Sequence, residues 1–347
     1  MSTNKQPTAF GRITPPREDW LAKLPPEDVI EPGLAIIDTH HHLWTERGRY
    51  LIDEMLAETG AGHNITATVF IECRTNYRTD GPAELRSVGE VAYVAGLAEA
   101  CLKLHPGQSR IADGIVGYAD LTLGDRVEPV LQALVQAGGG RFKGVRNSAG
   151  FHEDPIIGSN HHGAGPEHYL RTDFHAGLNV LTRTGLSLDA LVFHHQHADL
   201  LALARTCPDA NIIMNHTGMP LGYGPFAGKS REVYASWRAL LPELATCPNV
   251  SMKLGGMMMR LASFDYGTAE RPLTSAELAE HWRPYIEPCI ELFGAKRCTF
   301  ESNFPVDKMG IGYRAMWNAF KRIASGATAD EKAALFSGTA RRVYRLA

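Results

Sequence analysis

The stretch LAIIDTHHHLW, residues 34–44, decides the fold and the kind of site that this chain builds. Its apolar start, LAII, predicts a buried strand. Because alternate side chains of a strand share a face, His40 and His42 are expected to point the same way, with Asp38 behind them on that face. Two imidazoles at the carboxyl end of a strand can hold one divalent cation. The alternative is a histidine-rich turn without a chemical role. The apolar run favours the metal site, because parallel α/β proteins keep their sites at this end of the strands.

Composition excludes several classes of function. Of the 347 residues, 44% are hydrophobic and 21% charged, as in globular proteins, and a net charge of −3 gives no bias toward nucleic acid or an anionic membrane. We find no apolar run long enough for a membrane span and no secretion signal at the N-terminus. The six cysteines are scattered without a C-x-x-C pair, which predicts reduced thiols and a cytoplasmic protein.

Short β-rich runs and amphipathic stretches alternate along the chain. The predicted strands are Leu34–Asp38, Ala67–Glu72, Ile111–Tyr118, Phe142–Arg146, Ser187–Phe193, Asn211–Asn215, Val250–Leu254 and Cys298–Ser302. The predicted helices are Glu84–Leu104, Val127–Ala137, Leu200–Thr206, Ser230–Ala245, Ser275–Phe293 and Tyr313–Ala324. Eight βα units predict a distorted (β/α)8 TIM barrel, which needs about 250 residues. An open doubly wound sheet that binds a nucleotide would carry a glycine-rich first turn, where this chain has histidines.

Two segments exceed what the barrel needs. Residues 1–32 are rich in proline and charge and are expected to form an arm, which would suit a homodimer, on a single domain that spans 33–347. Residues 150–185 are expected to form a long insert after the fourth strand. Such a loop is often a lid over the substrate, and the alternative is a surface loop or an oligomer contact.

The ends of the predicted strands carry ionisable or amide groups, and in a barrel these ends form the active-site mouth. Alone, a histidine or arginine after a strand is more often packed or solvated than catalytic. Lys253 and Glu301 are more informative, because each lies in an apolar run where burial is costly without a polar cavity or a partner. The group as a whole therefore predicts an active site. Its members beyond the first strand are Glu72, Arg74, Tyr77, Arg146, His194, Gln196, His216, Lys253, Glu301 and Asn303.

The order of these motifs resembles the amidohydrolase superfamily, and within it the lactonase-like "amidohydrolase 2" group, which includes relatives of fuconolactonase and pyrone-dicarboxylate hydrolase and a decarboxylase. The resemblance runs from about residue 34 to the C-terminus and depends on DTHHHLW, KGVR, MNHTGMP, MKLGG and FESNFPV. It implies that His40 and His42 are metal ligands and that His194 is a ligand or a substrate contact. It further implies that His216 is a base or proton shuttle.

The resemblance also implies that Arg146 and Lys253 face a negative charge on the substrate. One departure concerns the eighth strand, which in the family usually ends in an aspartate that binds metal and takes a proton from water. Here Asn303 stands at that position, and a neutral amide does neither well. Glu301, on the same face, stands where the family has glycine, and Glu72 is a second unusual carboxylate. We infer that the charge is relocated, with Glu301 or Glu72 completing the metal shell.

The leading hypothesis is a hydrolase that opens a lactone or related ring ester of a small anionic substrate. His40, His42, His194 and Glu301 would hold a divalent ion, zinc or manganese, that activates water. His216, Glu301 and Asn303 form the predicted catalytic set. Arg74, Arg146 and Lys253 would bind carboxylates, and Tyr77, Gln196 and Glu72 would complete the substrate site.

Three alternatives remain at this point. Some family members work without a metal, so the same hydrolysis could proceed with the cationic side chains and histidines alone. Decarboxylation of an unsaturated acid occurs on the same scaffold. A barrel that binds a ligand without turnover is the non-enzymatic alternative, and the new carboxylates Glu72 and Glu301 weigh against it.

Overall fold

Eight parallel strands follow one another around a single sheet, in the order β1 to β8. The computed structural model describes residues 15–347 except 160, 260, 263–265, 267 and 268. The strands are β1 Ala35–His41, β2 Asn64–Ile71, β3 Arg110–Gly117, β4 Phe142–Arg146, β5 Ser187–Ala190, β6 Asn211–Met214, β7 Val250–Leu254 and β8 Cys298–Phe300. The predicted (β/α)8 barrel is confirmed.

The barrel closes between β1 and the segment that follows β8. The backbone N–H of His42 donates to the carbonyl of Phe304, and the N–H of Asn303 donates to the carbonyl of His40, both at 2.8 Å. Below them Asp38 accepts a hydrogen bond from the backbone N–H of Ser302 at 2.9 Å. This seam brings the first strand's histidines beside the residues that end the eighth.

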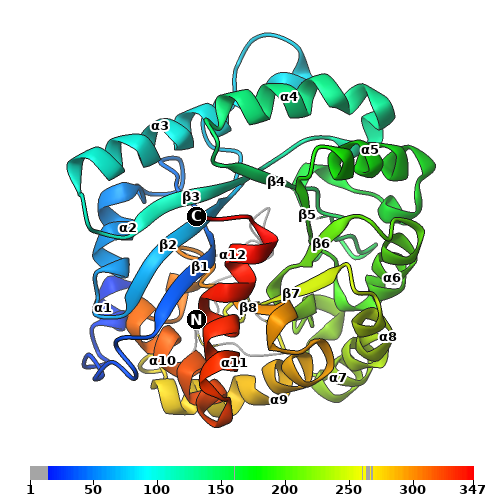
Figure 1. Ribbon diagram of the computed structural model, residues 1–347. Helices are drawn as coiled ribbons and strands as arrows, with labels where there is room; N and C mark the ends of the chain where they lie inside the picture. Colours follow the sequence, from blue (N-terminus) through cyan, green and yellow to red (C-terminus); the bar gives the residue numbers. More distant parts are fainter. Residues whose placement is uncertain (1–14, 160, 260, 263–265, 267–268) are drawn as a thin grey trace.

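Helices surround the barrel (Figure 1). They are α1 Glu18–Leu21, α2 Ile52–Thr59, α3 Val88–Leu104, α4 Glu128–Ala137, α5 Thr172–Arg183, α6 His197–Thr206, α7 Ser230–Ala239, α8 Leu241–Thr246, α9 Ser275–Phe293, α10 Tyr313–Ile323, α11 Ala329–Ala333 and α12 Thr339–Val343. The predicted helix over 230–245 is two helices, because Pro242 begins a new one in α8. Among the described residues no helix has the length and apolarity that a membrane crossing requires.

Helix α5 lies inside the segment that the sequence predicts as an insert, 150–185. It is the ordinary crossover helix between β4 and β5, so the irregular segment after β4 ends before Thr172. Gly177 lies inside α5 and weakens the helical pattern of this segment, because glycine is a poor helix former. Its place has a packing reason, because a Cβ there would overlap the Leu121 carbonyl of the neighbouring turn.

The C-terminal segment covers the amino-terminal end of the barrel (Figure 1). Ala340, Val343 and Tyr344 pack in one buried cluster with strand residues such as Val69 and Ile213. The Asn211 side chain, where β6 begins, donates to the carbonyl of Val343 at 2.9 Å. Because this end is plugged, the carboxyl ends of the strands are left to carry a site.

The N-terminal arm packs on the outside of α10. The N–H of Ile30 donates to the Asn318 side chain at 2.9 Å, and Lys321 Nζ donates to the carbonyl of Ile30 at 2.8 Å. Residues 1–14 of the predicted arm lie outside the described residues. All six cysteines are buried free thiols, as expected.

Candidate metal centre

Three buried side chains from different strand ends converge on one point. His40 Nδ1 lies 2.8 Å from Glu301 Oε2, and His216 Nδ1 lies 2.8 Å from Glu301 Oε1. Among the described residues this group has its possible ligand atoms within 4.8 Å of one another. β1 supplies His40, and the segments directly after β6 and β8 supply His216 and Glu301.

Two glycines after β7 make room for the group. A Cβ on Gly255 would overlap the Cγ of Glu301, and one on Gly256 would overlap the ring of His216. Gly256 also has φ +67°, a conformation that favours glycine. The MKLGG motif therefore serves the site through its two glycines as well as through its lysine.

The electrostatics of the group favour the protonation states that bind a cation. Burial acts to raise the pKa of Glu301, but the charge and hydrogen bonds of His216, together with the Lys253 cation, outweigh it and lower this pKa below its usual value. Burial, reinforced by the Lys253 cation, holds the pKa of His40 well below its usual value. An ionised carboxylate and a neutral imidazole are metal-binding forms.

These residues fit a divalent cation. Two imidazoles and a carboxylate are a ligand set typical of zinc, and a catalytic zinc site combines three protein ligands with an open position. The buried carboxylate at the centre of the group is the kind of charge that proteins pair or use to coordinate metals.

His42 lies beside the group. Its ring centre is 4.9 Å from that of His40, and it stacks on Trp44. His42 Nδ1 contacts the carbonyl of Ile71 at 2.8 Å, and since a carbonyl only accepts, Nδ1 carries the proton and Nε2 is the acceptor. Metal-binding histidines are commonly held by such a bond.

His194 follows β5 and contacts the loop after β6. It is not a member of the group formed by His40, His216 and Glu301. Its Nδ1 accepts a hydrogen bond from the backbone N–H of Leu221 at 3.3 Å, and its ring packs on Phe226 at 4.7 Å. Burial lowers the pKa of His194 to about 3, so the ring is neutral.

Lys253 is fully buried behind the metal group. Its Nζ lies 2.7 Å from Asp189 Oδ2 and 3.9 Å from Glu301 Oε2, and all three side chains have no exposed surface. Asp189 in β5 thus provides the counter-ion that a buried lysine requires.

Arg146 connects the metal group to the far wall of the site. Its Nε donates to Glu72 Oε1 at 2.8 Å, and its Nη1 lies 3.4 Å from His40 Nε2. The other oxygen of Glu72 lies 3.4 Å from Nε2 of His162, whose ring stacks on Tyr118 with ring centres 3.4 Å apart. The segment after β4 therefore reaches back over the carboxyl ends of β2 and β3.

The loop after β2 is held from below by Glu90 of α3. One oxygen of this buried carboxyl group accepts hydrogen bonds from the N–H groups of Cys73 and Thr75, at 2.9 and 3.0 Å. Arg74 between them has φ +67° and is exposed, whereas the Tyr77 hydroxyl is buried without a hydrogen-bond partner among the described residues.

Asn303 holds the loop after β8. Its Nδ2 donates to Asp307 Oδ1 at 2.8 Å, and its backbone N–H donates to the carbonyl of His40. Its backbone has φ +56°, a left-handed conformation, in the turn after β8. Asn303 therefore packs beside the metal group without belonging to it, whereas Glu301, two residues earlier, is a member of the group.

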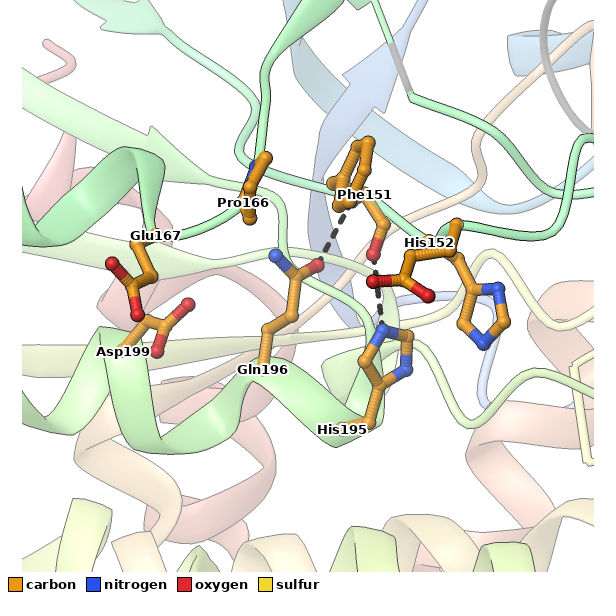
Figure 2. A pocket seen from close by; sticks show the side chains of 8 residues that line it. Phe151, His152, Pro166, Glu167, His195, Gln196 and Asp199 are labelled. Carbon is orange, nitrogen blue, oxygen red and sulfur yellow. Dashed lines mark hydrogen bonds between the residues drawn. The ribbon is translucent and has the colours of Figure 1, made fainter.

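Gln196 lines a cavity of about 340 Å³ beside the ends of β4 and β5. Its Oε1 accepts from the N–H of Phe151 at 2.9 Å, and its Nε2 donates to the carbonyl of Ala149 at 2.8 Å. Figure 2 shows the Gln196 amide directed at Phe151, with the carboxylates of Glu167 and Asp199 to one side. None of the residues that line this cavity belongs to the metal group.

Sequence reasoning missed Asp189, Glu90 and Tyr344. Asp189 had a usable signal: a carboxylate inside one buried strand and a lysine inside another, Lys253, are natural partners. Glu90 had a weaker signal, an acidic residue on the otherwise apolar face of a helix. Tyr344 had none, because its partner lies 155 residues away in the sequence.

Comparison with known proteins shows similarity to amidohydrolases and sugar lactonases. The model of the family described as Amidohydrolase matches residues 37–346. L-fucono-1,5-lactonase of Burkholderia multivorans is 27% identical over 317 residues, which cover 90% of this chain and 97% of that protein. L-rhamnono-gamma-lactonase of Scheffersomyces stipitis is 25% identical over 305 residues, which cover 80% of this chain and 87% of that protein.

One solved structure with a similar fold contains a metal ion. The amidohydrolase from Burkholderia multivorans with bound zinc has a TM-score of 0.69 and 25% identity, and the match covers 90% of this chain and all of that one. In this chain His40, His216 and Glu301 form a group that could hold a metal ion, in keeping with the expected divalent cation. Since the family model spans most of the sequence, the chain belongs to the amidohydrolase family and is a hydrolase of that family.

Proposed function

We propose that this protein opens a sugar lactone by hydrolysis, with a divalent cation held by His40, His216 and Glu301. The observation that carries the proposal is this buried group at the carboxyl end of the barrel, where a TIM-barrel enzyme has its active site. The names of two relatives, a fuconolactonase and a rhamnonolactonase, support the class of substrate. We include His42 as a further ligand, since its Nδ1 bond to Ile71 leaves Nε2 as the acceptor.

When bound, the cation polarises a carbonyl oxygen and makes a water ligand more acidic. The chain supplies the rest. Glu301, held in orientation by its hydrogen bond from His216, takes the proton of the attacking water. The water oxygen bonds to the lactone carbonyl carbon, the ring C–O bond breaks, and the departing alkoxide takes up a proton. Arg146, held by Glu72, orients His40 from the other side.

The ion pairs favour an uncharged substrate over the anionic one that the sequence suggests. Arg146 and Lys253, both expected to bind a carboxylate, have counter-ions within the chain, Glu72 and Asp189. A substrate carboxylate would have to displace these buried partners, which is costly. A polyhydroxy lactone needs only hydrogen bonds, and Tyr77 has a buried hydroxyl to offer.

The test uses the full chain, freed of metal with a chelator and reloaded with zinc. Neutral sugar lactones and a pyrone dicarboxylate are compared by the acid that each releases. We expect zinc-dependent opening of a neutral lactone. Full activity in the chelated protein would establish the metal-independent alternative. Carbon dioxide release from an unsaturated acid would establish a decarboxylase, and tight binding without product a non-catalytic barrel.

A further inference from the structure

A buried chain of polar contacts runs from the C-terminal plug to the metal group. Tyr344, directly after α12, donates its hydroxyl hydrogen to the Asp189 carboxylate, with oxygen–oxygen distances of 3.0 and 2.9 Å. Asp189 contacts Lys253 Nζ at 2.7 Å, and Lys253 reaches Glu301 at 3.9 Å. None of these four residues has exposed surface. The chain therefore crosses the barrel interior from its plugged end to its open end.

Lys253 lies between two carboxylates and is closer to one of them. The ammonium nitrogen is 1.2 Å farther from Glu301 than from Asp189, the difference between 3.9 and 2.7 Å. It also lies 5.4 Å from the centre of the Tyr344 ring, so the tyrosine contacts the lysine as well as its counter-ion. In this arrangement the lysine lies closer to its counter-ion Asp189 than to the metal group.

A buried ammonium ion that loses its counter-ion is expected to pair with another nearby carboxylate, because an unpaired charge in the protein interior is strongly unfavourable. For Lys253 that other carboxylate is Glu301. A lysine that closed onto Glu301 would occupy the oxygen that faces His40 and would oppose a divalent cation there.

We propose that Tyr344 and Asp189 are positioning residues that hold the Lys253 ammonium ion off Glu301, so that this carboxylate remains available to the cation. The inference rests on the metal group of the proposed function, and it goes further, since it assigns a role at the site to a residue of the C-terminal plug. Burial and the Asp189 charge keep the pKa of Tyr344 well above its usual value, so its hydroxyl remains a donor.

Zinc affinity, measured by competition with a chromophoric chelator, tests the proposal without a substrate. We expect Asp189→Asn to weaken zinc binding by about tenfold or more, and Tyr344→Phe by a smaller factor, because the lysine still has its counter-ion. The decisive variant is the double change Asp189→Asn with Lys253→Met. If the loss comes from the lysine closing onto Glu301, removing the lysine restores affinity to within about threefold of wild type.

Thr339→Val is the matched control for damage to the plug. Thr339 of α12 donates to the carbonyl of Ala295 at 2.9 Å and is buried like Tyr344, but this bond runs to a different partner. It should lower the melting temperature and leave zinc affinity unchanged. Circular dichroism checks that each variant is folded.

Zinc bound equally well by wild type, Asp189→Asn and Tyr344→Phe would overturn this inference and leave the proposed function intact. A double variant no better than Asp189→Asn would overturn it too. A wild-type protein that binds no zinc would overturn both, and lack of lactone opening with the affinity pattern above would overturn only the proposed function.

Discussion

One oxygen of Glu301 accepts two hydrogen bonds from His216, one from its backbone N–H at 2.9 Å and one from ring Nδ1 at 2.8 Å. The other oxygen faces His40. The carboxylate is therefore fixed in orientation before any cation arrives, and its burial makes each of these contacts stronger than it would be in water. We propose that a carboxylate held this way takes the role of an aspartate two positions later, where this chain has Asn303.

Glu301→Gln should abolish most of the function of the site. The amide keeps the size of the side chain but removes the negative charge, so we expect zinc affinity to fall by about 10- to 100-fold or more and lactone opening to fall with it. Isothermal titration with zinc and initial rates measure the two effects. The control is Glu58→Gln, which removes another largely buried carboxylate that pairs with Lys308. Equal losses in both variants would contradict the assigned role.

The pattern of the sequence predicted the barrel well because each strand is a short apolar run with clear ends. The bounds of β4, β7 and α9 agree with the prediction to the residue. The fifth strand is shorter than predicted: Leu191–Phe193 is apolar and buried, but it leaves the sheet toward the loop that carries His194. An apolar run indicates that its residues are buried. Whether they also pair in the sheet depends on where the neighbouring strand ends, so the strand can be shorter than the apolar run.

The sequence predicted which strand ends carry the residues of the site. It did not predict which of these side chains contact one another. The seam that joins β1 to the segment after β8 follows from the barrel, so the meeting of His40 and Glu301 could be anticipated. The sequence could not show which cationic side chains already have a counter-ion, because the ion pairs Arg146–Glu72 and Lys253–Asp189 depend on side-chain directions across the barrel. The sequence therefore suggested an anionic substrate, whereas the substrate that we propose from the ion pairs is a neutral one.

Glu90 predicts a pH dependence of stability. Burial, with the charge of Glu72, raises the pKa of Glu90 to about 8 from an ordinary value of 4.5. The folded protein thus holds this proton between pH 4.5 and 8 when the unfolded chain has lost it, and the stability that the group contributes is lost as the pH rises through 8. Glu90→Gln removes the titration and keeps an oxygen for the N–H groups of Cys73 and Thr75.

We therefore expect Glu90→Gln to become more stable relative to wild type as the pH rises, by up to about 1.4 kcal/mol per pH unit between 5 and 8. Urea unfolding at pH 5, 7 and 9 measures this difference. Glu90→Ala is the comparison, because it leaves two buried N–H groups unpaired and should destabilise at every pH, by roughly 1–3 kcal/mol for each group. Parallel curves for wild type and Glu90→Gln would refute the shifted titration.

His162→Ala should weaken the cover that the segment after β4 forms over the site. The change removes the stack on Tyr118 and the contact with Glu72. We expect a KM for the lactone raised by about three- to tenfold, faster proteolysis within residues 150–171 and unchanged zinc affinity. His152→Ala is the control in the same segment, since His152 contacts Phe226 and His195 instead. If the two variants behave alike, His162 has no special part in closing the site.

Gly256→Ala tests whether the backbone after β7 is shaped for the metal group. At φ +67° an alanine costs about 1–2 kcal/mol, and its Cβ would in addition overlap the His216 ring. We expect a total destabilisation of roughly 3 kcal/mol or more and a weaker affinity for zinc, because the ring must move from Glu301. Gly228→Ala separates the two causes, since Gly228 has φ +74° but nothing within 4 Å of its added Cβ. It should show only the backbone cost in urea unfolding and bind zinc like wild type. The same loss of stability in both variants, with zinc affinity unchanged, would mean that the ring of His216 tolerates the added methyl and that its position is set elsewhere.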